Sequence, residues 1–306
     1  MEAPRPHPGW FGVRVLITGA GGFVGRAVAR KMVEHGHDVI AWTRRTADLR
    51  SPAAVRDKLV GGGALDGVVH LAAVATVRES WAEPLRYFDT NAGGTSNLLA
   101  ALAGRQVPVV FASTAAVYGS KAVGALSEDL PAAPDNPYAA SKWAAEQLLS
   151  YQARTGAIGS TVLRLFNVAG ALPGITDPNT TRIIAACLRC AAGEIEYVTV
   201  NGDGSAMREF THVADVAEAI RLALASTSVG EARTFNVGTG VGVSMADVID
   251  VAREVTGHPI PVKHNPPANE PQVLVSDPSR AGQVLGWKPQ RSAIETVISD
   301  AWAEKR

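Results

Sequence analysis

The stretch VRVLITGAGGFVG, residues 13–25, decides the fold of this 306-residue chain. It begins with a short apolar run, passes through a turn with three glycines and continues into apolar residues at helical spacing. A short apolar run bounded by glycine is typical of a strand that is buried on both faces of a sheet. The stretch therefore predicts a buried strand, a tight turn and a helix.

The glycine-rich turn is of the kind that binds a dinucleotide. Gly19, Gly22 and Gly25 let the backbone turn tightly and approach a pyrophosphate. Phe23 and Val24 begin the helix, whose N-terminus favours an anion. A glycine pattern alone is a weak signal, and its position between a strand and a helix strengthens it. We expect a cofactor here; a structural turn without a ligand is the alternative.

Strand and helix patterns alternate along most of the chain. Further strands are expected at residues 39–42, 68–73, 108–113, 160–166 and 233–238. Helices are expected at residues 23–35, 84–103, 137–155 and 212–226. This alternation predicts an α/β fold, with a Rossmann-type, doubly wound parallel sheet that helices cover on both faces.

The alternation breaks after about residue 170, where turn-rich and proline-rich segments separate helices near 180–192, 244–256 and 291–304. We expect a smaller, discontinuous C-terminal substrate domain. The predicted division is a dinucleotide-binding domain of residues 13–170 with 209–240, a substrate-binding domain of residues 171–208 with 241–306, and a flexible tail of residues 1–12.

The composition excludes several classes of protein. Lys and Arg equal Asp and Glu at 29 each, which argues against nucleic acid or an anionic membrane as a partner. No uncharged apolar run reaches the roughly 18 residues of a membrane helix. Cys187 and Cys190 are interpreted as small apolar residues of a helix rather than as a redox or metal pair. We expect a cytoplasmic protein without a metal site.

The segments NPYAASK and FAST carry the candidate reactive groups. Tyr138 and Lys142 lie one turn apart on one face of a predicted helix. An ammonium beside a phenol favours the phenolate, so we expect a lowered pKa for Tyr138 and proton exchange with a sugar hydroxyl or ketone. Thr114, with Ser113 as its competitor, ends a buried strand and is expected to hold the reacting oxygen. An exposed helix pair is the alternative.

The second predicted strand ends in WTRRTADL, where dinucleotide-binding chains usually carry an acid. Thr43 removes the acceptor for the ribose hydroxyls, and Arg44, with Arg45 beside it, suits a 2′-phosphate. Asp48 is a candidate acceptor for the adenine amino group, and Leu49 a candidate cover for the ring. Solvated side chains are the alternative. We expect NAD(P), with NADP(H) favoured over NAD(H).

The chain contains, in this order, TGAGGFVG, HLAA, TNAGGT, STAAVYG, YAASK, LRLFNVAGA and GDGSAMREFTHVADV. Together, over about residues 13–300, these motifs resemble the extended short-chain dehydrogenase/reductases of the NAD(P)-dependent epimerase/dehydratase family. FNVAGA and REFTHV are most similar to UDP-glucose 4-epimerases. The resemblance implies a nucleotide-activated sugar substrate and a homodimer paired through helices 84–103 and 137–155.

The resemblance also implies roles for single residues. Thr114, Tyr138 and Lys142 match the catalytic triad, and Lys142 would also hold the nicotinamide ribose. Residues implied at the cofactor are Leu71, Ala72, Ala73 and Asn91. Residues implied at the substrate are Asn167, at the sugar nucleotide, and Arg208, at its pyrophosphate; the alternative for Arg208 is an ion pair with Glu209 or Asp203.

The chain departs from the family at two places. Pro267 stands where a second phosphate-binding arginine is usual, and Arg182, Arg189 or Lys263 are candidates to replace it. The segment between the second strand and HLAA is short and is expected to lack an additional strand.

Three functions are compatible with these motifs. The first is a nucleotide-sugar epimerase that inverts C4 of a UDP-hexose through a transient 4-keto sugar. The arginines and the short segment keep an NADPH-dependent 4-keto-sugar reductase open. The third is a non-catalytic dinucleotide-sensing protein on the same fold.

Overall fold

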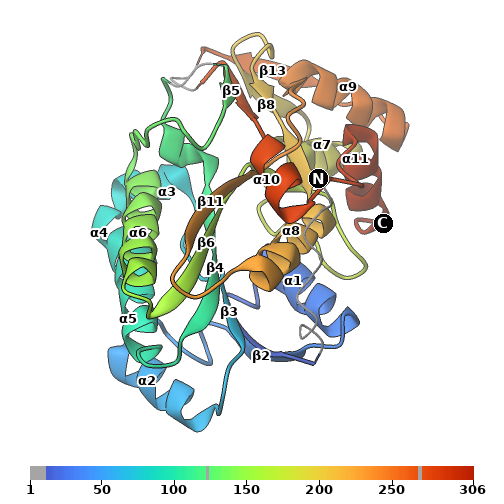
Figure 1. Ribbon diagram of the computed structural model, residues 1–306. Helices are drawn as coiled ribbons and strands as arrows, with labels where there is room; N and C mark the ends of the chain where they lie inside the picture. Colours follow the sequence, from blue (N-terminus) through green and yellow to red (C-terminus); the bar gives the residue numbers. More distant parts are fainter. Residues whose placement is uncertain (1–11, 122–123, 268–270) are drawn as a thin grey trace.

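A computed structural model describes residues 12–121, 124–267 and 271–306. Its centre is a six-stranded sheet in the order β11-β6-β4-β3-β1-β2, in which every neighbouring pair is parallel (Figure 1). The strands are β1 (Arg14–Thr18), β2 (Asp38–Trp42), β3 (Gly67–His70), β4 (Val107–Thr114), β6 (Ile158–Leu165) and β11 (Ala232–Val237). The predicted doubly wound α/β fold is confirmed.

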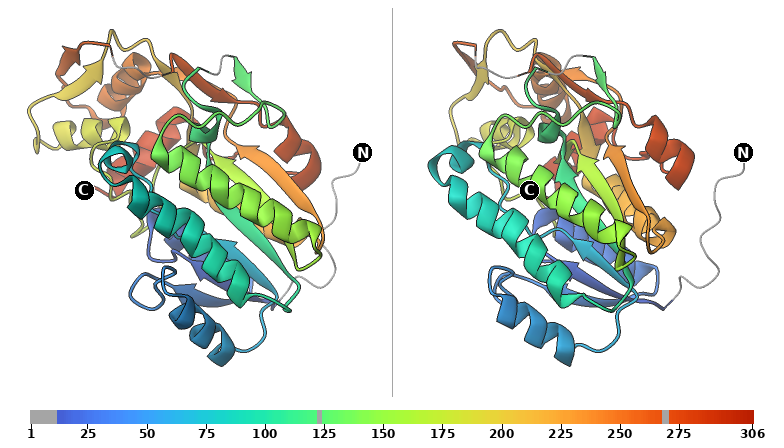
Figure 2. Two further views of the ribbon diagram at one scale, coloured as in Figure 1. Left: turned by 90° about the vertical axis from the view of Figure 1, so that its left-hand side faces the viewer. Right: turned by 60° about the vertical axis from the view of Figure 1, so that its left-hand side comes forward.

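Helices cover both faces of this sheet because successive strand residues point to opposite sides. Val15 and Ile17 belong to one core with the helices of one face, and Leu16 belongs to a second core with the helices of the other. The first face carries α1 (Phe23–Glu34) and α8 (Val213–Ser226), and the second carries α2 (Pro52–Gly61), α5 (Gly94–Ala101) and α6 (Pro137–Arg154). Figure 2 shows α5 and α6 side by side on the second face.

The strand order reverses beside β1. From β1 the chain passes to β2 on one side, and after α2 it returns to β3 on the other side. A crevice beyond the carboxyl ends of strands at such a reversal is the usual ligand site of open α/β sheets. Residues 43–66 contain α2 and no strand, so the expected absence of an additional strand is confirmed.

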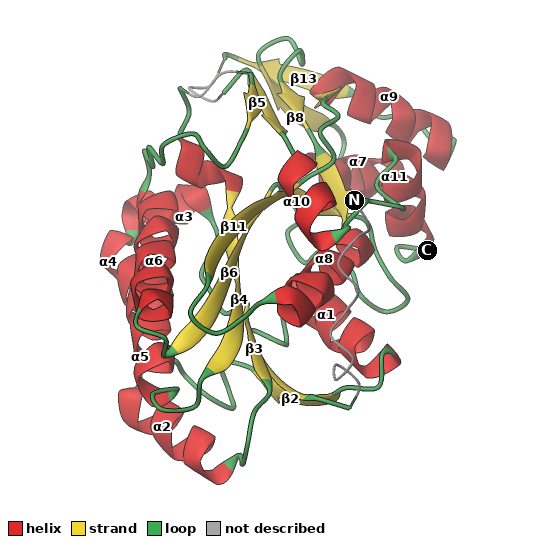
Figure 3. Ribbon diagram, in the orientation of Figure 1, coloured by secondary structure: helices red, strands yellow, loops and turns green. Residues whose placement is uncertain are grey.

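A further set of helices and short strands lies beyond the carboxyl ends of the sheet strands (Figure 3). Its helices α7, α9 and α11 enclose a core that contains Ile184, Val248 and Ile298. Cys187 and Cys190 are free thiols buried in this core, and burial raises the pKa of Cys187 to about 12. The elements are β5 (Ala125–Leu126), β7 (Asn167–Ala169), α7 (Ile183–Ala191), β8 (Val198–Asn201), β9 (Met207–Arg208), β10 (Phe210–His212), β12 (Val243–Ser244), α9 (Met245–Thr256), β13 (Val262–Asn265), β14 (Val273–Ser276) and α11 (Ile294–Ala303).

Four segments differ from the helices predicted by sequence. The helix expected over residues 84–103 is divided into α4 (Pro84–Tyr87), a π-helical segment η1 (Phe88–Gly93) and α5. The helices α2, α3 (Val77–Ala82) and α10 (Ser279–Leu285) were not predicted, and α10 packs on the sheet through Ala281 and Leu285. The expected tail over residues 1–12 lies, except for Gly12, outside the described residues. Over the described ranges, no helix is long and apolar enough to cross a membrane.

Candidate active site

The glycine-rich turn after β1 leaves room for a ligand against its backbone. Gly19 has φ +70°, and a Cβ atom there would lie 2.6 Å from the backbone nitrogen of Ala72. A Cβ atom at Gly25 would overlap the carbonyl oxygen of Gly19. Gly22 is the N-cap of α1, which has no acidic residue in its first turn. The turn therefore fits a pyrophosphate, because only glycine suits its close approaches and the helix N-terminus favours an anion.

The loop after β3 is held by a buried histidine that the sequence motifs contain but that we did not single out. His70 Nδ1 lies 2.7 Å from Thr18 Oγ1, and His70 Nε2 lies 2.9 Å from Thr95 Oγ1. Burial lowers the pKa of His70 to about 3, so its ring is neutral at physiological pH. Thr18 Oγ1 in turn accepts from the backbone nitrogens of Leu71 and Ala72, at 3.2 and 3.3 Å. The loop after β3 is thus fixed to β1.

Asn91, expected at the cofactor, fixes the same loop from the π-helical segment. Its Oδ1 accepts from Val74 N at 2.9 Å, and its Nδ2 donates to Val74 O at 3.0 Å and to Ser141 Oγ at 2.9 Å. Ser141 Oγ donates to the carbonyl of Tyr138 at 2.8 Å. A π-helical segment inside an α-helix is frequent at functional sites. Asn91 therefore joins the loop after β3 to the helix that carries Tyr138.

The end of β2 lies against the glycine-rich turn. A Cβ atom at Gly21 would meet Thr43 Cγ2 at 3.2 Å, and Thr46 Oγ1 accepts from Thr43 N at 2.8 Å. The side chains of Arg44 and Arg45 are exposed, and neither forms an ion pair with any residue that the structure describes. Both guanidinium groups are therefore available to an anion at this strand end.

The two candidates for adenine binding already have protein partners. Asp48 Oδ2 accepts from Arg50 Nη2 at 2.6 Å, and this hydrogen bond is the largest cause that lowers the pKa of Asp48 to about 2. Leu49 is buried in the core of the second sheet face, and its carbonyl accepts from Asn97 at 2.8 Å. Their roles at adenine stay predictions.

The three candidate catalytic residues meet at the carboxyl edge of the sheet. Asn136 caps α6 by accepting from Ala139 N at 2.9 Å, which places Tyr138 in the first turn and Lys142 one turn later. Thr114 ends β4, and its hydroxyl acts on the Tyr138 phenol, whose pKa it lowers. The Lys142 ammonium is buried and lies 4.0 Å from the ring centre of Phe111 on β4.

The expected lowering of the Tyr138 pKa by Lys142 is wrong for the protein by itself. Burial raises the pKa of Tyr138, and the Thr114 hydroxyl and the charge of Arg182 oppose that rise. Burial also lowers the pKa of Lys142 to about 7, against the raising effect of Glu146. Desolvation is thus the largest cause for both groups, and neither group is among the causes that shift the pKa of the other.

Ser113, the competitor of Thr114, has a different partner. Its hydroxyl donates to Glu146 Oε1, which lies on α6 one turn after Lys142. The same carboxylate accepts from Arg164 on β6, at 2.8 Å for Nη2 to Oε2 and 3.3 Å for Nε to Oε1. Thr114 is therefore the hydroxyl directed to Tyr138. No sequence signal indicated the buried pair of Glu146 and Arg164, whose members lie on different elements.

The candidate substrate residues Asn167, Arg182 and Arg208 line one cavity of about 540 Å³. Asn167 Nδ2 donates to the carbonyl of Glu209 at 3.1 Å, and Arg208 Nη1 donates to the carbonyl of Met207 at 2.8 Å. The Glu209 carboxylate is buried and accepts from three backbone nitrogens, those of Thr239, Gly240 and Ser276. Segments that are distant in the sequence are thereby held around Arg208.

Pro267 lines a second cavity of about 960 Å³, which shares Arg208 with the first. Of the candidate replacements for the missing arginine, Lys263 lies 3.5 Å over the ring of Tyr197 and is not among the residues around either cavity. Arg189 and Arg182 both line the first cavity. Arg189 pairs with Glu194 at 3.2 Å, and Arg182 pairs with Asp177 at 2.8 Å. Within the described part of the chain, no cluster of His, Cys, Asp or Glu could hold a metal ion.

Comparison with known proteins adds to this geometry. Residues 15–238 match the sequence model of the NAD dependent epimerase/dehydratase family. A UDP-glucose 4-epimerase of Corynebacterium glutamicum is 36% identical over 313 residues, which cover 95% of this chain and 95% of that protein.

Two solved structures are similar over nearly the whole chain. One is UDP-glucose-4-epimerase from Stenotrophomonas maltophila with bound NAD and formylated UDP-arabinopyranose; it is 31% identical, with a TM-score of 0.89, and the match covers 96% of this chain and 98% of that one. The other is RMD from Pseudomonas aeruginosa complexed with NADPH; it is 27% identical, with a TM-score of 0.84, and the match covers 95% and 98%.

Proposed function

The chain belongs to the NAD dependent epimerase/dehydratase family, and we propose that it is a nucleotide-sugar 4-epimerase that inverts C4 of a UDP-hexose through a transient 4-keto sugar. The meeting of Thr114, Tyr138 and Lys142 beside the glycine-rich turn carries the proposal. The similar Corynebacterium protein is named a UDP-glucose 4-epimerase, and the Stenotrophomonas structure holds both NAD and a UDP-sugar.

Proton transfer at the sugar C4 oxygen is the task of Tyr138. Its phenol donates to a keto oxygen as an acid and accepts from a hydroxyl as a phenolate. Thr114 holds the same oxygen, and Lys142 lies one turn along α6 to bind ribose hydroxyls and stabilise the phenolate. When bound, the nicotinamide supplies hydride exchange at C4 and, in its oxidised form, a positive charge beside the phenol. Because burial raises the pKa of Tyr138, these positive charges are what make it a base near neutral pH.

The turn and the loop after β3 are the proposed dinucleotide site. The backbone around Gly19 and Gly22, with the first turn of α1, binds the pyrophosphate. The proposed cofactor contacts from the other segments are Phe23, Val24, Thr43, Asp48, Leu49, Leu71, Ala72 and Ala73.

We further propose that the protein accepts NADP(H), and accepts it in preference to NAD(H). Thr43 stands at the end of β2, and the exposed, unpaired guanidinium of Arg44 suits a 2′-phosphate, with Arg45 beside it. The similar RMD structure contains NADPH, and the Stenotrophomonas structure contains NAD, so both dinucleotides occur on this fold.

In the substrate site, we propose that Arg182 takes the place of the arginine that Pro267 lacks. Arg182 lines the same cavity as Asn167 and Arg208. Its charge also reaches Tyr138, where it lowers the phenol's pKa. Arg182 and Arg208 would then supply two guanidinium groups to the diphosphate of a UDP-sugar, with Arg182 exchanging its ion pair with Asp177 for the phosphate.

A homodimer through α4, η1 and α6 is proposed from the apolar side chains that these elements expose. Leu85 on α4 is 82% exposed, and Phe88 on η1 and Leu148 and Tyr151 on α6 are exposed as well. Clustered apolar side chains on one surface are typical of a protein interface. Sedimentation velocity should report a dimer, and charged substitutions at Leu85 and Tyr151 together should give a monomer.

The division into two domains is also a proposal. The separate core of α7, α9 and α11 supports a substrate domain of residues 171–208 with 241–306. The helix α10 lies within the residue range of this substrate domain but packs on the sheet of the dinucleotide domain, residues 13–170 with 209–240. The two domains therefore share α10.

Turnover without added cofactor tests the epimerase proposal. Purified protein is incubated with UDP-galactose, and UDP-glucose is measured by proton NMR; the protein is then denatured and any released nicotinamide is identified. We expect isomerisation in the absence of added dinucleotide and none with Tyr138→Phe. Turnover of only a 4-keto sugar, with consumption of added NADPH, would establish a reductase instead. No turnover in either assay, with unchanged cofactor binding by Tyr138→Phe, would favour a binding protein.

A further inference from the structure

Glu146 lies on α6 one helical turn after Lys142, and it is 4% exposed. We propose that Glu146 is a positioning residue for the reaction: its buried carboxylate, held in place by Arg164, keeps the Lys142 ammonium protonated one helical turn from Tyr138. The inference rests on the proposed function only in so far as Lys142 acts with Tyr138; the charge relationship between Glu146 and Lys142 can be measured without turnover.

The surroundings of Glu146 select its ionised form. Its oxygens accept hydrogen bonds from the Ser113 hydroxyl on β4 and from two nitrogens of Arg164 on β6. A carboxylate without a proton accepts all three bonds, whereas a protonated one would place a donor against a guanidinium. A buried carboxylate and guanidinium in this geometry form a charged pair.

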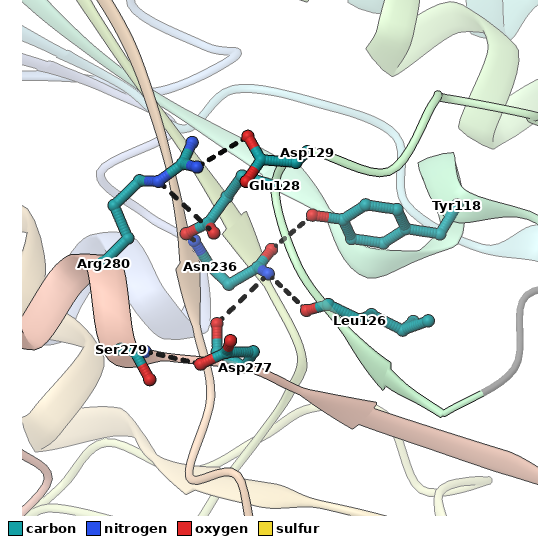
Figure 4. A network of polar contacts seen from close by, with 8 residues as sticks. All are labelled: Tyr118, Leu126, Glu128, Asp129, Asn236, Asp277, Ser279 and Arg280. Carbon is teal, nitrogen blue, oxygen red and sulfur yellow. Dashed lines mark hydrogen bonds and ion pairs between the residues drawn. The ribbon is translucent and has the colours of Figure 1, made fainter.

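Arg164 is fixed in turn by the elements around it. Its guanidinium lies 4.8 Å from the ring centre of Tyr118, whose hydroxyl donates to Asn236 Oδ1 at 2.7 Å. Asn236 Nδ2 donates to the carbonyl of Leu126 at 2.7 Å, as Figure 4 shows. The chain of contacts therefore runs from α6 through β6 and the 3₁₀ helix η2 (Ala115–Tyr118) to β11 and β5, which restricts the position of the Glu146 carboxylate.

Lys142 faces few charged groups. His70 on β3 is neutral at physiological pH, because burial holds its pKa at about 3. The Phe111 ring of β4 lies beneath the ammonium. Glu146 is the acid that raises the pKa of Lys142 against burial, which otherwise lowers it. The titratable or charged groups around this pair are His70, Tyr118, Tyr138, Arg164 and Arg182.

The consequence concerns the charge of Lys142 at working pH. With Glu146 ionised, the ammonium persists up to a pKa of about 7. Without that negative charge, burial would lower the pKa of Lys142 further, and the amine would be neutral at pH values where Tyr138 needs a positive neighbour. The catalytic lysine therefore depends on a side chain that does not itself reach the substrate.

Glu146→Gln tests this relationship, because glutamine keeps the shape and removes the charge. The protein is prepared with ¹³C at the lysine ε position, and the Lys142 signal is identified by its loss in Lys142→Met. We expect the pH midpoint of the Lys142 titration to fall by at least about one unit in Glu146→Gln. At pH values above the midpoint, about tenfold less Lys142 is then in the ammonium form. The alkaline limb of the kcat/KM profile should move to lower pH by the same amount, with the loss of activity smaller at pH 6 than at pH 8.

Glu218→Gln is the matched control, since Glu218 pairs with Arg221 and Lys31 on the other face of the sheet. It should leave both the Lys142 midpoint and the pH profile unchanged. Glu146→Asp, which keeps the charge, should restore most of the wild-type profile. An unchanged Lys142 midpoint in a folded Glu146→Gln would overturn the proposal and leave Glu146 a structural residue.

A second variant covers the case in which Glu146→Gln does not fold, because it leaves Arg164 without its partner. Replacing Glu146 and Arg164 together by methionine removes both buried charges, and such replacements by apolar residues are often tolerated. A fall in the Lys142 midpoint is again expected, smaller than in Glu146→Gln because a positive charge is removed as well; a midpoint equal to that of the wild type overturns the proposal. The NMR titration needs no substrate, so its result can be interpreted even if the epimerase assay shows no activity.

Discussion

A Cβ atom at Gly19 would lie 2.6 Å from the backbone nitrogen of Ala72, so the turn after β1 and the loop after β3 are in direct backbone contact. The contact arises because β1 and β3 are parallel neighbours whose carboxyl ends meet at the same edge of the sheet. It joins the proposed pyrophosphate site to the loop that Asn91 holds beside α6. Dinucleotide binding and the placement of Tyr138 therefore depend on the same few backbone segments.

Gly19→Ala should weaken dinucleotide binding at least tenfold. The left-handed φ of +70° costs an alanine about 1–2 kcal/mol, and the overlap with Ala72 forces one of the two segments to move. Titration calorimetry with NAD and NADP measures the effect. Gly36→Ala is the control, since Gly36 has a similar φ of +78° but no atom within 4 Å of an added Cβ. Equal affinities for the two variants would contradict the prediction.

Tyr138→Phe should lower kcat by roughly 10²–10⁴-fold, the usual contribution of a positioned acid or base. The ring contact with Tyr87, at 6.3 Å between centroids, is retained in the variant, so we expect little change in melting temperature. Rates of UDP-sugar isomerisation are compared with those of Tyr151→Phe, an exposed position on the same helix. A loss of less than tenfold would assign the proton transfer to another group.

Arg44→Ala should weaken NADP binding at least tenfold and NAD binding less than twofold. A hydrogen bond to a charged group contributes about 1.5–3 kcal/mol, and only NADP carries the 2′-phosphate. Arg56→Ala is the control for a general loss of positive charge, because Arg56 is also an exposed arginine but lies farther along the chain, on α2. Dissociation constants for both dinucleotides decide the matter, and equal losses would refute a specific phosphate contact.

The fold was predictable from the sequence because its signals are local. The apolar runs and glycine-rich turn place β1, α1 and β2 within one or two residues of their observed ends. The π-helical segment at Phe88–Gly93 was not predictable, since helical periodicity does not show where one hydrogen bond is displaced. The short helix α10 was missed because its few residues carry too little periodicity to read.

The site residues that belong to a sequence motif were predictable. Their pKa values and hydrogen-bond partners, which depend on burial, were less so. Tyr138 and Lys142 follow from their spacing, but the direction of the Tyr138 pKa does not, because desolvation depends on packing that spacing cannot report. The partners of Ser113 and Leu49 also follow from burial. By sequence, Ser113 and Leu49 were each as suitable for ligand binding as the residue next to it. In the structure, Ser113 is hydrogen-bonded to Glu146 and Leu49 is buried in the core.

Arg208→Ala and Arg182→Leu should each weaken UDP binding at least tenfold, because each removes a charged contact to the diphosphate. Arg189→Leu is the comparison: Arg189, in the last turn of α7, lines the same cavity and is ion-paired as Arg182 is, but of the two only Arg182 acts on the pKa of Tyr138. Pro267→Arg, added to Arg182→Leu, should recover part of the affinity. Calorimetry with UDP alone measures these effects without turnover. If Arg182→Leu binds UDP as tightly as the wild type does, Arg189 becomes the candidate for the second positive charge at the diphosphate.

Acid should destabilise the wild-type protein more than a His70→Gln variant. The folded-state pKa of His70 is about 3, well below the unfolded value near 6.5, so below pH 6.5 the unfolded state binds a proton that the folded state excludes. The stability that the neutral ring contributes is therefore present above pH 6.5 and is lost as the pH falls toward 3.

Urea unfolding at pH 7 and pH 4.5 measures this difference. Two pH units below 6.5 correspond to roughly 2–3 kcal/mol of lost unfolding free energy in the wild type, and this part should vanish in His70→Gln. Lys142, with a folded pKa of about 7, is protonated in both states over most of this window and adds little to the slope. His258→Gln, at an exposed histidine, should retain the wild-type slope. If the unfolding free energy changes equally with pH in the wild type and in His70→Gln, the His70 ring gains its proton without unfolding. Its bonds to Thr18 and Thr95 would then not hold the loop after β3 as inferred.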